Sequence, residues 1–233
     1  MAEKTLNINL KSKIKQSQPT VQAISYNDWS IKIFMKNFLH VGCGPKHKNQ
    51  TTSAFNTPDW CEIRLDIDPV VSPDVVGSIT DMPAVETASV QAVFSSHNIE
   101  HLYPHDVPLA LAEFYRVLSH DGFVVITCPD LQSVCALIAE DKLTEAAYIS
   151  PAGPIAPLDI LYGHRVAMAN GNLYMAHRCG FTKKVLSATL QAAGFQAVAA
   201  MARPACFDLW ALASKIAIDE SELRSLAAAH FPK

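Results

Sequence analysis

The chain has 233 residues, of which 49% are hydrophobic and 18% charged, so it is long enough for one domain with a sizeable core. A formal net charge of −3 gives it no general basic character, which speaks against nucleic acid and anionic membranes as partners. It has six cysteines but no Cys-x-x-Cys pair, no signal-peptide core and no run of about 18 apolar residues. We therefore expect a cytoplasmic protein with no membrane segment.

The first part of the chain divides into an arm and the start of a domain. Residues 1–33 are polar and rich in Lys, Gln and Asn, and we interpret them as an N-terminal arm ahead of a domain over 34–233. Apolar runs in this domain predict strands at about 37–41, 61–66, 90–95 and 122–127. A helical apolar spacing predicts a helix over 107–118, ended by Asp121-Gly122. This alternation predicts an α/β fold with a doubly wound, mostly parallel sheet.

The C-terminal third follows a different pattern. An amphipathic helix is predicted over 182–193, capped by Thr182 and stopped by Gly194. Two extended runs follow at 195–203 and 207–213, and the three residues between them are too few for a helical crossover. These runs therefore predict an antiparallel hairpin, after which residues 214–233 form a helical tail.

Residues of about 130–180 fit no alternation of strands and helices. A long segment of this kind in a compact domain is usually functional. It follows the strand at 122–127 at its carboxyl end, where ligands bind in open α/β sheets. We interpret it as an insertion that caps the substrate side.

A glycine turn and an acid point to a nucleotide cofactor. Gly42 and Gly44 end the first apolar run, and Asp66 ends the next run about 20 residues later. The glycines let backbone approach a ligand closely, and the acid accepts hydrogen bonds from ribose hydroxyls. Asp68 is read as a turn former before Pro69, with an exchange of roles between the two acids as the alternative.

These features resemble the class I S-adenosylmethionine-dependent methyltransferases, most closely the type 11 group, from Leu39 to about Ala213. The resemblance is carried by the glycine turn at 41–45, Asp66, the segment 94–102 with its Glu-His-Leu, the segment 113–118, and the terminal hairpin. It implies a Rossmann-like sheet of seven strands with an antiparallel C-terminal hairpin. It also implies transferase activity with S-adenosylmethionine as the cofactor.

The resemblance further implies a set of cofactor contacts. Ser78 stands where the family often has an Asp that binds adenine; its hydroxyl can accept a hydrogen bond, and Ile79 can pack on the ring. Lys46 stands where methyltransferases often have a third glycine, which argues against NAD. The predicted cofactor-binding residues are Gly42, Cys43, Gly44, Asp66, Ile67, Ser78, Ile79, Ser95 and Ser96.

Three histidines are the candidate catalytic residues. His97 directly follows the strand at 90–95, and His164 and His177 come from the capping segment. We predict that one of them orients the acceptor or acts as a base; the alternative is that they only hold the cap to the sheet. The predicted substrate-binding residues are His101, Tyr103 and Tyr162. The alternative for His101 is that it only caps or packs against the start of a helix.

The segment from His97 to His101 also matches the His-x-x-Glu-His pattern of inverted zinc peptidases. Its position after a buried strand in a cofactor-binding fold speaks against that function, so we predict no metal.

The sequence thus predicts a methyltransferase acting on a small or medium-sized acceptor molecule. A homodimer is an open alternative to a monomer. Two rival functions are kept: a non-catalytic protein that binds S-adenosylmethionine or S-adenosylhomocysteine, and a nicotinamide-dependent oxidoreductase. The incomplete glycine pattern and the terminal hairpin disfavour the second rival.

Overall fold

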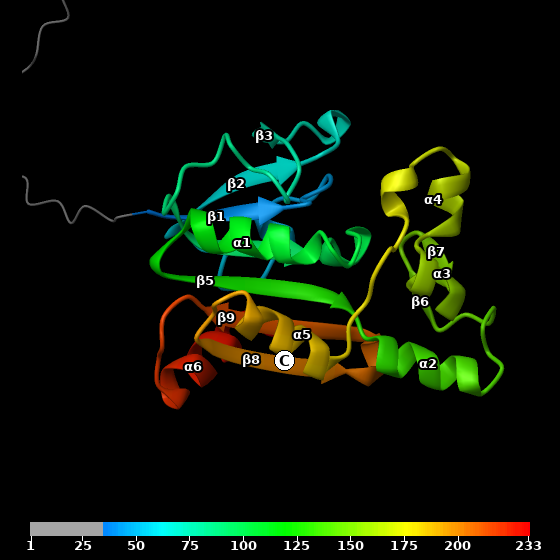
Figure 1. Cartoon of the computed structure of the whole chain (residues 1–233). Helices are drawn as coiled ribbons and strands as arrows, with labels where there is room; N and C mark the ends of the chain where they lie inside the picture. Colours follow the sequence, from blue (N-terminus) through cyan, green and yellow to red (C-terminus); the bar gives the residue numbers. More distant parts are fainter. Residues whose placement is uncertain (1–34) are drawn as a thin grey trace, which may run out of the picture. The chain divides into compact units, whose positions relative to one another are not determined.

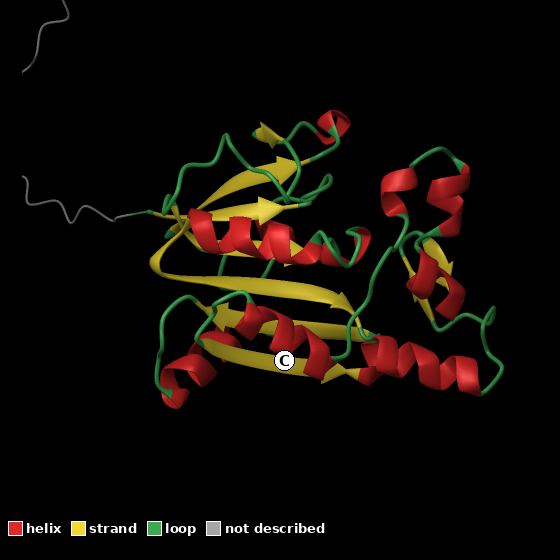
Figure 2. Cartoon of the chain, in the orientation of Figure 1, coloured by secondary structure: helices red, strands yellow, loops and turns green. Residues whose placement is uncertain are grey.

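A seven-stranded sheet forms the centre of the computed structural model, which describes residues 35–233. The predicted arm therefore lies outside the described residues. The strand order is β3-β2-β1-β4-β5-β9-β8, in which β9 runs antiparallel to both β5 and β8 and the other pairs are parallel (Figure 2). The strands are β1 (Lys36–Val41), β2 (Trp60–Asp66), β3 (Val75–Val76), β4 (Val90–Ser96), β5 (Leu118–Pro129), β8 (Ala197–Arg203) and β9 (Asp208–Ser214). The predicted fold class, with its antiparallel hairpin, is confirmed.

Helices pack on both faces of this sheet. Helices α1 (Val107–Val117) and α5 (Lys183–Ala192) lie together on one face (Figure 1), where their apolar side chains share a buried cluster with Leu39 and Val41 of β1. Phe38, on the opposite side of the same strand, belongs to a second buried cluster against α6 (Glu220–His230). In residues 35–233 no helix is both long and apolar enough to cross a bilayer.

Strand β5 begins earlier than the sequence indicates. Helix α1 ends at Val117, and β5 starts at the next residue. Its register with β4 shifts between Val90, which pairs with Leu118, and Ala92, which pairs with Phe123. Asp121-Gly122 therefore lies in an irregular stretch inside the strand and does not end the helix directly.

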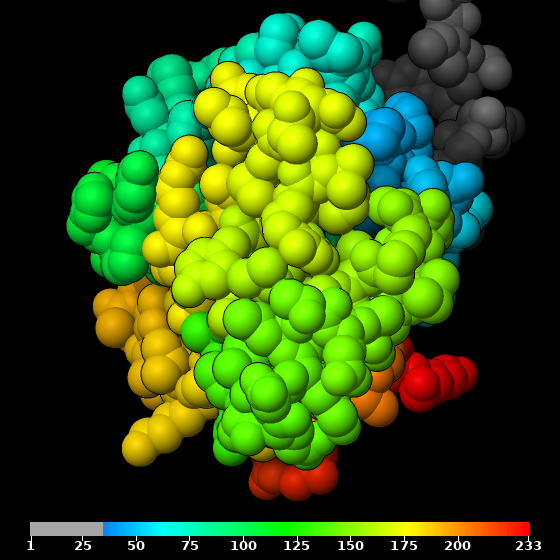
Figure 3. Space-filling view, turned by 90° about the vertical axis from the view of Figure 1, so that its right-hand side faces the viewer, coloured from blue at the N-terminus to red at the C-terminus, as the bar shows by residue number. Residues whose placement is uncertain are grey.

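The segment between β5 and α5 is more regular than predicted. It contains helix α2 (Leu131–Ala139), a small hairpin of β6 (Tyr148–Ser150) and β7 (Gly153–Ile155), and helices α3 (Pro157–Tyr162) and α4 (Arg165–Ala169). These elements lie beyond the carboxyl ends of the parallel strands (Figure 1), and they cover much of that end in the space-filling view (Figure 3). We refer to residues 131–180 as the cap segment.

Candidate functional site

The turn after β1 depends on its glycines. Gly42 and Gly44 have φ angles of +58° and +52°, in the left-handed region that favours glycine. A Cβ atom at Gly42 would lie 2.3 Å from Cγ of Asn98, whereas one at Gly44 would meet nothing within 4 Å. The lack of a side chain at Gly42 therefore makes room for the Asn98 side chain. At Gly44 the space where a Cβ would lie is empty.

Asp66 anchors this turn to the neighbouring strand. It is the last residue of β2, which runs parallel to β1, and its side chain is buried. The Gly44 N–H donates to Oδ2 of Asp66 at 2.7 Å, and the Asp68 N–H donates to Oδ1 at 2.9 Å. Both carboxylate oxygens keep further acceptor capacity, because each has lone pairs beyond the one used.

A cavity of about 290 Å³ lies beside these residues, and we call it the glycine-turn cavity. Of the predicted cofactor-binding residues, it is lined by Gly42, Gly44, Asp66, Ile67, Ser78 and Ile79. The Ser78 hydroxyl lies 2.7 Å from that of Thr80, so one of the two donates to the other. Six residues from three separate loops thus meet at one cavity, although they are up to 37 positions apart in the chain.

The other three predicted cofactor residues do not line this cavity. Cys43 and Ser95 are fully buried, and burial raises the pKa of the Cys43 thiol to about 11, so that it stays neutral. Ser96 accepts a hydrogen bond from the hydroxyl of Thr127 at 3.1 Å. The role of these three residues toward a cofactor stays a prediction.

The second cavity has a volume of about 510 Å³, and we call it the histidine cavity. His97, His164 and His177 all line it, so the fold brings the three predicted catalytic residues together. His97 and His101 line the glycine-turn cavity as well and stand between the two spaces. The backbone of His97 has a φ of +48°, an unusual value for a residue with a side chain and one often found at functional sites.

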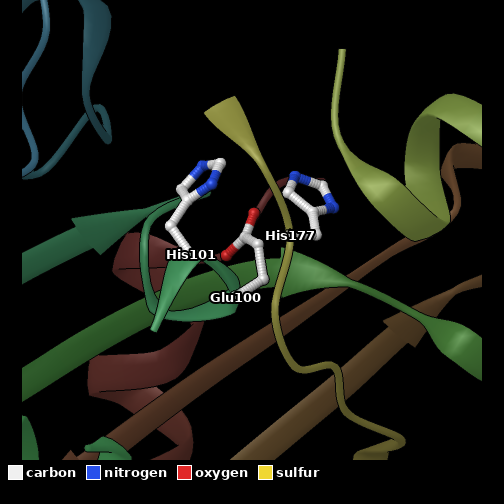
Figure 4. Close-up of side chains that lie close together, drawn as sticks. All are labelled: Glu100, His101 and His177. Atoms are coloured by element: carbon white, nitrogen blue, oxygen red, sulfur yellow. The ribbon is translucent and has the colours of Figure 1, made fainter. Parts of the chain in front are cut away.

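Glu100 lies beside His97, His101 and His177. It belongs to a 3-10 turn at Ile99–His101, and its carboxylate points between the rings of His101 and His177 (Figure 4). Its side chain is 1% exposed, and neither oxygen has a hydrogen-bond partner among the described residues. Burial acts to raise the pKa of Glu100, but nearby His97, followed by His101 and His177, outweighs it, so the pKa is lowered.

His177 is held by the cap segment. Its Nδ1 lies 2.7 Å from the carbonyl oxygen of Ile160, in helix α3. Burial lowers its pKa, while the charge of Glu100 acts in the opposite direction. The neutral imidazole is therefore its ordinary state near pH 7, as a base or a metal ligand requires.

The predicted substrate-binding tyrosines lie elsewhere. Tyr103 and Tyr162 are 51% and 61% exposed, and neither lines the two cavities described. The guanidinium of Arg178 stacks over the Tyr103 ring at 4.9 Å. A substrate role for either tyrosine stays a prediction.

Several cavity residues were missed by sequence reasoning. The glycine-turn cavity is also lined by Asn98, Asn172, Tyr174, Met175 and Arg178, and the histidine cavity by Tyr148, Arg203 and Asp208. Asn98 and Arg178 are next to predicted histidines in the chain, which is a signal that could have found them. The others come from the cap segment and the hairpin, whose three-dimensional placement no local pattern shows.

Comparisons with known proteins agree with this geometry. Residues 39–126 match the family model described as a methyltransferase domain. A solved methyltransferase from Archaeoglobus fulgidus, described as SAM-dependent, is 17% identical, with a TM-score of 0.51 over 78% of this chain and 88% of its own. A protein of known structure from Pyrococcus horikoshii is 13% identical, with a TM-score of 0.52 over 77% of this chain and 81% of its own. No sequence among the curated proteins matches the chain.

The fold and the family match define the class. The chain has the class I methyltransferase fold, and its residues 39–126 match the family model of a methyltransferase domain. The resemblance predicted from sequence is confirmed, and the same findings support S-adenosylmethionine as the cofactor.

Proposed function

We propose that the chain is a methyltransferase that binds S-adenosylmethionine in the glycine-turn cavity and a small or medium-sized acceptor in the histidine cavity. The observation that carries the proposal is the buried Asp66 carboxylate, which two backbone N–H groups hold at the wall of the first cavity. Bound S-adenosylmethionine supplies an activated methyl group on a sulfonium sulfur.

The residues of the glycine-turn cavity fit this cofactor. The free lone pairs of Asp66 accept the two ribose hydroxyls, and the backbone of Gly42 and Gly44 leaves room for a close approach. Ser78 and Ile79 lie in the same wall and suit the adenine ring, as a hydrogen-bonding group and an apolar surface.

The residues between the cavities position the acceptor. Methyl transfer is an in-line displacement, so holding the acceptor close to the donor and aligned with it contributes most of the acceleration. His97 contacts both cavities and is 49% exposed at its side chain, so it can orient an acceptor or take its proton. The cap segment closes the histidine cavity from the other side, through His164 and His177.

Calorimetric titration of the purified chain tests the proposal. S-adenosylmethionine and S-adenosylhomocysteine should both bind, and NAD should not. Binding of NAD alone would contradict the proposal. Binding of both S-adenosyl compounds, with no conversion of S-adenosylmethionine to S-adenosylhomocysteine in any acceptor mixture, would instead favour the non-catalytic binding protein.

A further inference from the structure

Three side chains that can bind a metal ion, Glu100, His101 and His177, lie together beside the histidine cavity. A carbonyl oxygen only accepts hydrogen bonds, so the nitrogen facing it must carry the proton. His101 places Nδ1 3.1 Å from the Ala176 carbonyl, and His177 places Nδ1 2.7 Å from the Ile160 carbonyl. With Nδ1 carrying the proton, Nε2 is the nitrogen of each ring that can offer a lone pair to a metal ion. The unpartnered carboxylate of Glu100 adds a third acceptor.

These acceptors lie close to one another. One ligand atom from each of Glu100, His101 and His177 is within 4.8 Å of the other two, and the two rings meet edge to face with centroids 4.8 Å apart. Within residues 35–233, no donor makes a hydrogen bond to either oxygen of Glu100; Nδ1 of His97 lies 3.4 Å from Oε1, without hydrogen-bond geometry. A buried carboxylate without a partner is costly, so this arrangement calls for a cation.

We propose that Glu100, His101 and His177 bind one divalent transition-metal ion of the zinc type at the wall between the two cavities. Two imidazoles and one carboxylate are a ligand set that such ions prefer. A hydrogen bond from Nδ1 to a backbone carbonyl is the outer-shell contact that fixes a metal-binding imidazole. Metal–ligand bonds of about 2.0–2.1 Å need the ligand atoms closer together than 4.8 Å, so metal binding has to draw the three side chains inward.

The rest of the histidine cavity supports this site. Its other two carboxylates, Asp159 and Asp208, are already paired with Arg165 and Arg203. Glu100 is thus the carboxylate of the cavity that no arginine or lysine pairs with in the described part of the chain; its basic neighbour is His97, whose Nδ1 lies 3.4 Å away. This proposal departs from our prediction of no metal, and it makes His177 a ligand, whereas we predicted that one of His97, His164 and His177 orients the acceptor or acts as a base.

Three protein ligands leave at least one position open, and all three residues line the histidine cavity. An acceptor with a hydroxyl oxygen fits that position, because the ion lowers the pKa of a bound hydroxyl and its proton passes to water. This second step rests on the proposed function, whereas metal binding itself does not.

Metal content of the full chain tests the site without any cofactor. The purified protein is incubated with Zn²⁺, passed through a desalting column and analysed by mass spectrometry for metals. We expect about one Zn²⁺ per chain, and visible absorption bands when Co²⁺ replaces it. The variants Glu100→Gln, His101→Ala and His177→Ala should each bind Zn²⁺ roughly a hundredfold more weakly or worse.

The control is His120→Ala, because His120 is exposed on the irregular stretch of β5 and remote in sequence from the three ligands. It should bind Zn²⁺ as the unmodified chain does. Thermal unfolding adds a second readout: Zn²⁺ should raise the melting temperature of the unmodified chain and of His120→Ala, but not of a folded Glu100→Gln.

Two results would overturn the proposal. One is an unmodified chain that retains no Zn²⁺ or Co²⁺ after desalting. The other is equal retention by the ligand variants and His120→Ala. If Zn²⁺ binds as expected while S-adenosylmethionine does not, the metal site stands and the proposed function fails.

Discussion

The carboxylate of Asp66 accepts a hydrogen bond of 2.7 Å from the backbone N–H of Gly44. This contact joins the ends of two neighbouring parallel strands, β1 and β2, at the glycine-turn cavity. The same side chain therefore shapes the turn and faces the space where a ribose would lie.

Asp66 and Asp68 are predicted to contribute differently to the binding of S-adenosylmethionine. Asp66→Asn and Asp66→Ala should weaken S-adenosylmethionine binding by about tenfold or more, since each removes charge and acceptor capacity facing the ribose. Asp68→Asn should change it much less, because the Asp68 carboxylate already accepts the Val70 N–H in its own turn. Calorimetry on the three variants measures this. The reverse order of effects would assign the ribose contact to Asp68.

Gly42 and Gly44 are predicted to differ in how much stability the protein loses when each is replaced by alanine. Gly42→Ala should lower the free energy of unfolding by roughly 2–4 kcal/mol, because the new Cβ both meets Asn98 and sits at positive φ. Gly44→Ala should cost only about 1–2 kcal/mol, since its Cβ meets nothing within 4 Å and only the backbone conformation is unfavourable. Urea unfolding compares them. Equal losses would show that Asn98 moves away freely.

His230 is predicted to make stability depend on pH. It is buried beside Thr52, and burial lowers its pKa to about 4. In the unfolded chain its pKa is about 6.5, so between these values the unfolded state binds more protons than the folded state. Stability should therefore fall by about 3 kcal/mol as the pH drops from 6.5 to 4.

Unfolding of His230→Gln checks this pH dependence. The variant should lose most of the slope between pH 6.5 and 4, while an exposed histidine variant, His120→Gln, should keep it. An unchanged slope in His230→Gln would mean that another group carries the acid sensitivity.

The ion pair of Asp159 with Arg165 is predicted to order the cap segment. The Arg165 side chain, as the largest cause, lowers the pKa of Asp159 to about 2, and the Ala156 N–H also donates to the same carboxylate. Asp159→Asn should lower the free energy of local opening at the start of α3 and at its link to α4 by about 1–2 kcal/mol. Hydrogen exchange over residues 156–169 should speed up in this variant. It should stay unchanged in Glu220→Gln, which breaks an exposed pair in α6.

Local patterns predicted most of the sheet and one wall of the site. The glycine turn, Asp66 and the hairpin each depend on neighbours in the chain, and a short run of residue types encodes them.

The other wall of the site depends on contacts that are distant in sequence. Glu100 and His177 are 77 positions apart, and what brings them together includes the backbone hydrogen bond from the Arg178 N–H to the Glu100 carbonyl. No local spacing encodes that contact. The surroundings of Tyr103 and Tyr162 could not be predicted for a similar reason. The position of an aromatic residue near a motif does not show which way its side chain faces.

A crystal structure with S-adenosylhomocysteine tests the central claim most directly. We expect the ribose hydroxyls within hydrogen-bond distance of Asp66, the adenine beside Ser78 and Ile79, and the sulfur directed toward His97 and the histidine cavity. A nucleoside bound away from Asp66, or a sulfur directed away from the histidine cavity, would contradict the account.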